Sequence, residues 1–149
     1  MRRRVLQIRD EIHKEFGTQC LLLQESNPPL EKRLALWSSA DIILCSSLKD
    51  GLCIPVLEYV KCRMMAGKFR SSTMICSEFA GCNEAMRGVL VYNPFSATAF
   101  LETMDKALSL TPDEKEENMK LAYQYVKRNS VTKWTEGFLK DLKLAYQPV

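Results

Sequence analysis

Short apolar runs alternate with segments of helical periodicity along this chain, and the alternation limits the possible fold more than any other feature. Each run has three or four consecutive apolar residues, without alternation of apolar and polar positions. A strand has this composition when helices cover both faces of its sheet, as they do in parallel sheets. The sequence therefore predicts an α/β fold with a doubly wound parallel sheet.

The expected elements follow from these two patterns and from turn and cap residues. Strands are predicted at Cys20–Leu23, Asp41–Cys45, Thr73–Cys76 and Gly88–Tyr92. Helices are predicted from Val5 to Phe16, from Leu30 to Trp37, from Ile54 to Met64 and from Asn83 to Met86. From Ser96 to the end the pattern is helical, with three helices, one of them starting at Thr111–Pro112.

Length, composition and charge exclude several classes of protein. The chain has 149 residues, enough for one domain, and its 46% hydrophobic and 26% charged residues are typical of a globular protein. Arg2, Arg3 and Arg4 account for the whole net charge of +3, so no nucleic-acid partner is expected. The absence of a long apolar run predicts no membrane partner and a cytoplasmic protein.

The cysteines do not show the spacing of a metal site. The six are Cys20, Cys45, Cys53, Cys62, Cys76 and Cys82. No two of them form a C-x-x-C pair, and the chain has a single histidine, so a zinc site would need at least three cysteines from scattered positions. The sequence favours buried reduced thiols, and neither a metal nor a cofactor is predicted.

One predicted loop has the form of an anion site. Ligands of an open parallel sheet bind beyond the carboxyl ends of its strands. There, Leu48–Glu58 runs from a strand through Gly51 into a helix, whose first N–H groups stabilise a phosphate. Glu58, one turn into that helix, can accept hydrogen bonds from sugar hydroxyls, so the spacing suits a sugar nucleotide. A plain turn followed by a solvated glutamate is the alternative.

A second loop, Ser77–Cys82, follows the next predicted strand. It contains Ala80 and Gly81, small residues that allow a ligand to approach the backbone closely. Tight packing against another part of the chain explains small residues equally well. This loop alone therefore does not identify a site.

Together these segments resemble the C-terminal half of the trehalose-6-phosphate synthases, family 20 retaining glycosyltransferases of the GT-B type with two facing Rossmann-like domains. The matching segments, in the family's order, are Trp37–Ile43, Ser47–Leu52 with Glu58–Val60, Ser77–Gly81, Val89–Phe95 and Trp134–Leu142. The resemblance extends from Gln7 to near the end of the chain. The Ser77–Gly81 segment argues against another two-domain glycosyltransferase, such as a sucrose or glycogen synthase relative.

The resemblance implies transfer of glucose from UDP-glucose to glucose 6-phosphate, without a metal. It assigns Asp50, Gly51, Leu52 and Cys53 to the donor glucose, Ile54 and Pro55 to the diphosphate, Glu58 to the ribose and Pro28 to the uracil. It implies no catalytic residue in this chain, because the leaving phosphate of the donor helps to deprotonate the acceptor.

Two departures from the family pattern favour an alternative, a catalytically inactive, trehalose-phosphate-synthase-like regulatory protein. The chain has Leu52 and Cys53 where relatives have methionine and asparagine, and Pro55 where relatives have a residue with an N–H. A lost charge-assisted hydrogen bond costs about 1.5–3 kcal/mol, or about ten- to a hundredfold in affinity. Proline also simply suits the first turn of a helix.

The resemblance implies that residues 1–149 are the donor-binding domain of a longer protein. Family members have an N-terminal acceptor domain, which would be this domain's partner within the same chain, and without it no transfer is expected. The loop at Met65–Ser72 resembles plant-type relatives, in which a phosphatase domain follows, so a phosphatase domain after Val149 is a further expectation. The last helix is expected to lack a partner in this domain.

Overall fold

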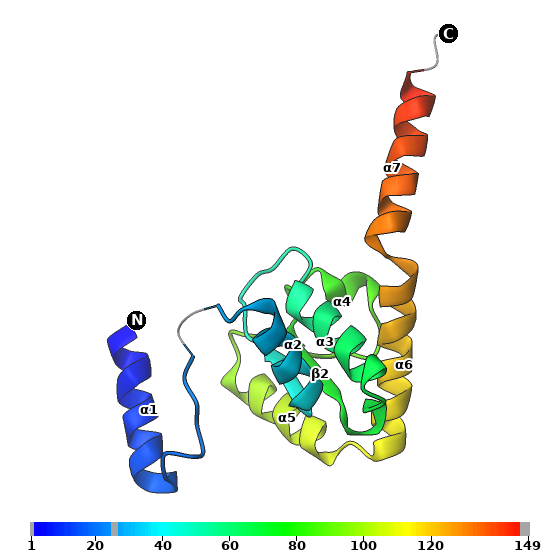
Figure 1. Ribbon diagram of the computed structural model, residues 1–149. Helices are drawn as coiled ribbons and strands as arrows, with labels where there is room; N and C mark the ends of the chain where they lie inside the picture. Colours follow the sequence, from blue (N-terminus) through cyan, green and yellow to red (C-terminus); the bar gives the residue numbers. More distant parts are fainter. Residues whose placement is uncertain (1, 25–26, 147–149) are drawn as a thin grey trace. The chain divides into compact units, whose positions relative to one another are not determined.

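The computed structural model describes residues 2–24 and 27–146 and is shown in Figure 1. The chain divides into two compact units, Met1–Leu30 and Glu31–Val149. In the first unit, helix α1 spans Arg2–Phe16, as predicted. It ends where Gly17 adopts a φ of 87° and donates its N–H to the carbonyl of His13.

The predicted strand at Cys20–Leu23 is wrong. Residues 20–24 are irregular, and the side chain of Leu22 is 85% exposed. A strand of a parallel sheet exists only where a neighbouring strand supplies its hydrogen bonds, and no described strand pairs with this segment. An apolar run is therefore not sufficient to form a strand.

The sheet lies in the second unit and consists of three parallel strands in the order β1-β2-β3. The strands are β1 (Ile42–Cys45), β2 (Thr73–Ser77) and β3 (Leu90–Tyr92), each within two residues of its predicted limits. Cys45 of β1 is in register with Cys76 of β2. The carboxyl ends of β1 and β2 therefore lie at one edge, where the predicted loops begin.

The helices of the second unit follow the predicted order. They are α2 (Leu30–Ser39), α3 (Ile54–Met65), α4 (Cys82–Ala85), α5 (Ala97–Ser109), α6 (Pro112–Arg128) and α7 (Val131–Ala145), with a 3₁₀ helix, η1 (Phe69–Ser71). At the predicted start of α6, the Thr111 hydroxyl accepts the N–H of Glu114, and the Glu114 carboxylate accepts the N–H of Thr111. This reciprocal capping stabilises the first turn.

Helices cover both faces of the sheet. Met74 and Cys76 of β2 belong to a core cluster with residues of α3 and α6, whereas Ile75 packs with Tyr92 and with Ala107 of α5. Neighbouring residues of a strand point to opposite faces, so this alternation separates the two clusters. All five residues of β2 are buried, which confirms the predicted doubly covered parallel sheet.

A fully buried arginine joins the elements at the other edge of the sheet. Arg63 of α3 donates to the carboxylate of Asp41 at 2.9 Å and to the hydroxyls of Ser71 and Ser72, both at 2.6 Å. It also donates to the carbonyls of Ser38 and Ser71. These contacts connect α3 to the end of α2, the start of β1 and η1.

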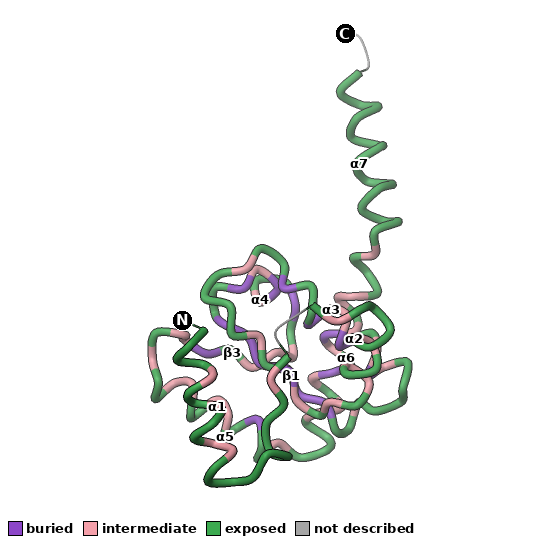
Figure 2. The backbone as a smooth tube through the Cα atoms, turned by 60° about the vertical axis from the view of Figure 1, so that its left-hand side comes forward, coloured by how far each residue is buried: buried purple, intermediate pink, exposed green. Residues whose placement is uncertain are grey.

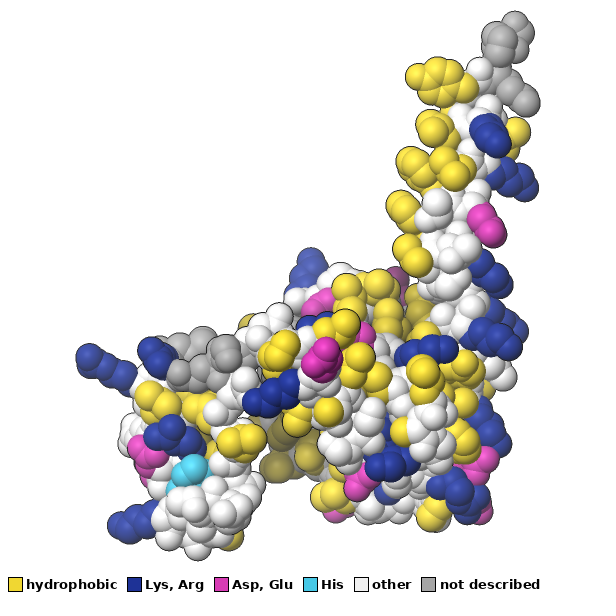
Figure 3. All heavy atoms as spheres, in the orientation of Figure 1, with side chains coloured by type: hydrophobic (Ala, Val, Ile, Leu, Met, Phe, Trp, Pro, Cys, Tyr) yellow, Lys and Arg dark blue, Asp and Glu magenta, His cyan; other side chains and the backbone are white. Residues whose placement is uncertain are grey.

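Helix α7 has no buried residue, and Figure 2 shows it exposed along its length. Its apolar side chains form a row along one side in Figure 3, with basic residues on the other side. The large exposed apolar residues are Val131, Trp134, Phe138, Leu139, Leu142 and Leu144. The last helix thus lacks a partner for this row within the described residues, as expected.

No described helix combines the length and the apolar character needed to span a bilayer.

Candidate functional site

The two loops singled out in the sequence lie side by side at the carboxyl edge of the sheet. Asp50 and Ala80 form an isolated parallel bridge. The N–H of Gly81 donates to the carbonyl of Asp50 at 3.0 Å, and the N–H of Asp50 points to the carbonyl of Phe79 at 3.4 Å. The Ser77–Cys82 loop therefore fixes the position of the turn that leads into α3.

Gly81 is required by this packing. A Cβ atom at position 81 would lie 1.9 Å from the carbonyl oxygen of Gly51, which is a backbone atom that has no rotamer to change. At Gly51 itself an added Cβ would meet nothing within 4 Å, and the φ of Gly51 lies outside the left-handed region. Of the two explanations for the small residues of the Ser77–Cys82 loop, the structure shows tight packing at Gly81.

The carboxylate of Asp50 orders the turn. Its Oδ1 atom accepts the N–H of Cys53 at 2.7 Å and the N–H of Leu52 at 3.1 Å. Cys53 then takes a left-handed conformation, with φ 54°, the one positive φ of a non-glycine residue among the described ranges 2–24 and 27–146. Two of the backbone donors assigned to the donor glucose thus bond to Asp50 in this structure.

Helix α3 begins at Ile54, directly after this turn, and Pro55 occupies its first turn. The N–H groups of a helix's first turn have no partner within the helix, so proline is compatible with this position. Proline also removes one donor from the set that faces an anion. The structure thus confirms that Pro55 suits the helix, and its effect on a bound diphosphate stays a prediction.

Glu58 lies one turn into α3, and α2 holds its carboxylate. Arg33 donates from Nε to Oε2 and from Nη2 to Oε1, each at 2.9 Å, and the indole N–H of Trp37 donates to Oε2 at 3.1 Å. The side chains of Arg33 and Glu58 are about one-quarter exposed. Glu58 is thus an ordered, half-buried acceptor and not the solvated residue of the alternative interpretation.

The surroundings of Glu58 favour its charged form. Desolvation opposes ionisation, but the hydrogen bonds from Arg33 and Trp37 and the charge of Arg33 outweigh it, so the pKa of Glu58 is lowered. A carboxyl group whose pKa is lower in the folded state stabilises that state above its unfolded pKa, and this contribution disappears as the pH falls through the folded pKa.

We predict that the Glu58→Gln variant is less stable than the wild type at neutral pH and that the gap closes below about pH 4.5, the ordinary pKa of glutamate. Glutamine does not titrate, whereas protonation of Glu58 at low pH removes the charged contact with Arg33 from the wild type. Glu114 and Glu116, whose pKa values are also lowered, contribute equally to both proteins. Urea unfolding across pH 3 to 7 measures the gap, and a gap that is constant with pH would contradict this account.

Sequence reasoning did not identify Arg33 as the partner of Glu58. The available signal was spacing, since Arg33 and Trp37 are four residues apart and share one face of a helix. Pro28, assigned to the uracil, is half-buried and belongs to the first unit. Its assignment stays a prediction.

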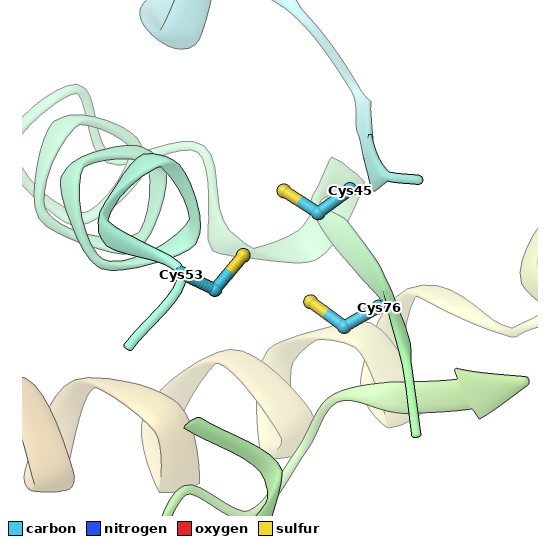
Figure 4. Close-up of side chains that lie close together, drawn as sticks. All are labelled: Cys45, Cys53 and Cys76. Atoms are coloured by element: carbon cyan, nitrogen blue, oxygen red, sulfur yellow. The ribbon is translucent and has the colours of Figure 1, made fainter. Parts of the chain in front are cut away.

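Three of the scattered cysteines converge beneath the turn. The sulfur atoms of Cys45, Cys53 and Cys76 lie within 4.8 Å of one another, and Figure 4 shows them pointing toward a common centre. The neighbouring thiols of Cys45, Cys76 and Cys82 lower the pKa of Cys53, and Cys53 in turn raises the pKa of Cys45 to about 12. The sequence contained one indication of this convergence. The predicted strands Asp41–Cys45 and Thr73–Cys76 both end in a cysteine, and the ends of parallel strands lie at the same edge of a sheet.

Comparisons with known proteins agree with this architecture. The model of glycosyltransferase family 20 matches residues 1–144. The α,α-trehalose-phosphate synthase (UDP-forming) of Candida albicans is 28% identical over 145 residues, which are 95% of this chain and 30% of that enzyme. The chain thus spans under one-third of that enzyme's length.

Two solved structures show the same fold. The N-terminal domain of Candida albicans trehalose-6-phosphate phosphatase superposes with a TM-score of 0.84 at 29% identity, over 98% of this chain and 31% of that chain. The α,α-trehalose-phosphate synthase of Burkholderia xenovorans, solved with glucose-6-phosphate, superposes with a TM-score of 0.80 at 21% identity, over 95% of this chain and 32% of that chain. The match across residues 1–144, with this Rossmann-like fold of the GT-B type, shows that the chain belongs to glycosyltransferase family 20, the family of the trehalose-phosphate synthases.

Proposed function

We propose that this chain is the donor-binding part of a trehalose-phosphate synthase, which transfers glucose from UDP-glucose to glucose 6-phosphate with retention. The observation that carries the proposal is the turn from Asp50 to Cys53. It leads from the carboxyl edge of a parallel sheet into α3 and is fixed by the Ser77–Cys82 loop. Within family 20, this is the place where a sugar nucleotide would bind.

The start of α3 would hold the diphosphate. Ile54 contributes the first N–H of a helix of 12 residues, and the helix dipole favours negative charge at this end. Pro55 contributes no donor, so fewer N–H groups than usual face the phosphates. The backbone and the dipole would supply the stabilisation that a metal supplies elsewhere.

The two acidic side chains would bind the sugars. Only Oδ1 of Asp50 bonds within the turn, so Oδ2 can accept a hydroxyl of the donor glucose, beside Gly51. Arg33 and Trp37 use three of about four acceptor positions on Glu58 and orient the carboxylate, which leaves Oε1 room for a ribose hydroxyl. Pro28 would support the uracil.

In the proposed reaction, the bond from the glucose anomeric carbon to the UDP oxygen breaks while the acceptor hydroxyl bonds to that carbon on the same face. The hydroxyl proton passes to the departing phosphate, so no side chain of this chain acts as nucleophile. The residues described here bind and orient the donor, and that positioning lowers the barrier. The acceptor domain of the longer protein would bring glucose 6-phosphate.

A second candidate function is a synthase-like domain that has lost transfer activity and regulates another protein or domain. Three observations favour it. Pro55 removes an N–H donor from the proposed diphosphate site, and Asp50 bonds to two of the N–H groups assigned to the donor. In addition, one of the similar structures is named as the N-terminal domain of a trehalose-6-phosphate phosphatase.

Restoring the missing donor tests the site. We predict that Pro55→Ala binds UDP about ten- to a hundredfold more tightly than the wild type, because it regains a charge-assisted hydrogen bond of about 1.5–3 kcal/mol. Uridine, which lacks phosphates, should bind both proteins equally. Calorimetric titration measures both ligands, with the exposed Glu117→Ala as a control that leaves affinity unchanged.

Two results would count against the synthase proposal. Equal UDP affinities for the wild type and Pro55→Ala would indicate that the diphosphate does not bind at the start of α3. No binding of UDP or UDP-glucose to either protein at millimolar concentration would favour the regulatory candidate.

A further inference from the structure

Three of the six cysteines, Cys45, Cys53 and Cys76, come together behind the donor turn, and a fourth, Cys82, interacts with two of them. Cys45 ends β1, Cys76 lies in β2, Cys53 precedes α3 and Cys82 is the first residue of α4. Cys53 is 1% exposed, and Cys76 and Cys82 are fully buried. The proposed binding of UDP-glucose uses none of these thiols.

The separation of the sulfur atoms fits a thiolate-bound metal ion. Zinc binds thiolate at about 2.3 Å, so two thiolates of one tetrahedral site are about 3.8 Å apart. The sulfur atoms of Cys45, Cys53 and Cys76 are already within 4.8 Å of one another and point inward (Figure 4). Small side-chain rotations would bring them to bonding distance.

Cys82 is the candidate for a fourth ligand, although its sulfur lies outside the group of three. It is fully buried, Cys53 and Cys76 are the main influences on its thiol, and that thiol donates to the side-chain oxygen of Asn83 at 3.7 Å. Four sulfur donors with no histidine or carboxylate among them form the closed Cys₄ set of structural zinc sites. The start of α3 lies beside Cys53, and its dipole favours the negative charge of such a site.

We propose that Cys45, Cys53 and Cys76, with Cys82 as fourth ligand, form a structural site for a zinc ion. Binding would deprotonate the thiols, release their protons to solvent and form four zinc–sulfur bonds without a redox step. The ion would join β1, β2, α3 and α4 and hold Cys53 in its left-handed conformation. It would fix the geometry of the donor turn but take no part in the transfer.

Metal coordination would help to explain the left-handed backbone of Cys53. A non-glycine residue with positive φ needs its surroundings to hold it there, and coordination of Cys53 would add to the bonds of Asp50. Thiols could also converge merely as apolar core residues, as the sequence favoured. Packing alone would then account for the cluster, and the experiment below separates the two.

The test measures metal binding directly. Protein purified under reducing conditions, stripped with a chelator and reloaded with zinc should hold one zinc ion per chain by elemental analysis. Titration with cobalt(II) should give the intense visible bands of a tetrahedral thiolate complex, which zinc then displaces. The Cys53→Ser and Cys76→Ser variants should lose the bands, whereas Cys20→Ser and Cys62→Ser, which lie outside the cluster, should keep them.

The cobalt titration of the wild type needs no variant, so the proposal remains testable where a serine variant fails to fold. A wild type that takes up no zinc and shows no tetrahedral cobalt spectrum would overturn it. So would equal metal binding in Cys53→Ser, or loss of binding in Cys62→Ser. The readout is independent of UDP-glucose binding, so failure of the donor site and failure of the metal site are distinguishable.

Discussion

Replacing Gly81 by alanine is expected to lower the free energy of unfolding by about 3 kcal/mol or more and to displace the donor turn. The added Cβ would lie 1.9 Å from the carbonyl oxygen of Gly51 and 3.1 Å from its carbonyl carbon. Backbone atoms move only if the turn moves, so the bond from Gly81 to the carbonyl of Asp50 would break as well.

Gly51→Ala is the matched control for this substitution. The two glycines face each other across the contact, yet an added Cβ at position 51 meets nothing within 4 Å. Its unfolding free energy should change by less than about 1 kcal/mol, because neither φ nor space requires glycine there. Urea unfolding of the three proteins measures the difference, and equal stability of Gly81→Ala and Gly51→Ala would contradict the proposed contact.

Replacing Arg63 by alanine is expected to lower the free energy of unfolding by about 3–5 kcal/mol, through lost hydrogen bonds and a cavity in the packing. The guanidinium is fully buried and makes five hydrogen bonds, to Ser38, Asp41, Ser71 and Ser72. Its removal leaves the buried Ser72 hydroxyl and the half-buried Ser38 carbonyl without this donor and opens a cavity between α3 and the start of β1. Asp41 is 73% exposed, so its carboxylate would be hydrated after the loss of the ion pair.

Two further variants show whether the shape of the guanidinium matters at position 63. Arg63→Lys should restore only part of the stability, because one ammonium group does not reach acceptors on several elements at once. Arg70→Ala should cost little, because Arg70 is exposed and its ion pairs with Asp113 and Glu116 are solvent-screened. Thermal unfolding measures the loss of stability in each variant. An equal loss in Arg70→Ala and Arg63→Ala would contradict the structural role of the buried arginine.

The α/β class could be predicted from the sequence, because a strand that is buried on both faces of its sheet has a continuous run of apolar residues. The three strands of the sheet and the capped start of α6 were predicted from continuous apolar runs and from Thr111–Pro112. Cys20–Leu23 has the same apolar run and is not a strand. Whether such a run forms a strand depends on a neighbouring strand, and that information is not local.

The candidate site shows the same division between local and long-range information. The turn at Asp50 and the helix start at Ile54 could be predicted because they follow from adjacent residues. The other contacts of the site are long-range. Arg33 and Glu58 are 25 residues apart, and Cys45 and Cys76 are more than 25 residues apart. Only the packing of α2 on α3 and the register of β1 with β2 bring these side chains together.

The turn from Asp50 to Cys53 and the start of α3 are proposed to bind a sugar nucleotide. Two-dimensional ¹H–¹⁵N NMR of the labelled chain during titration with UDP-glucose tests it most directly, because each backbone amide reports on its own surroundings. Binding at this turn should give saturable shifts of the amides of Gly51, Leu52, Cys53 and Ile54. Saturable shifts elsewhere with these four amides unchanged, or no shifts at millimolar UDP-glucose, would contradict the claim.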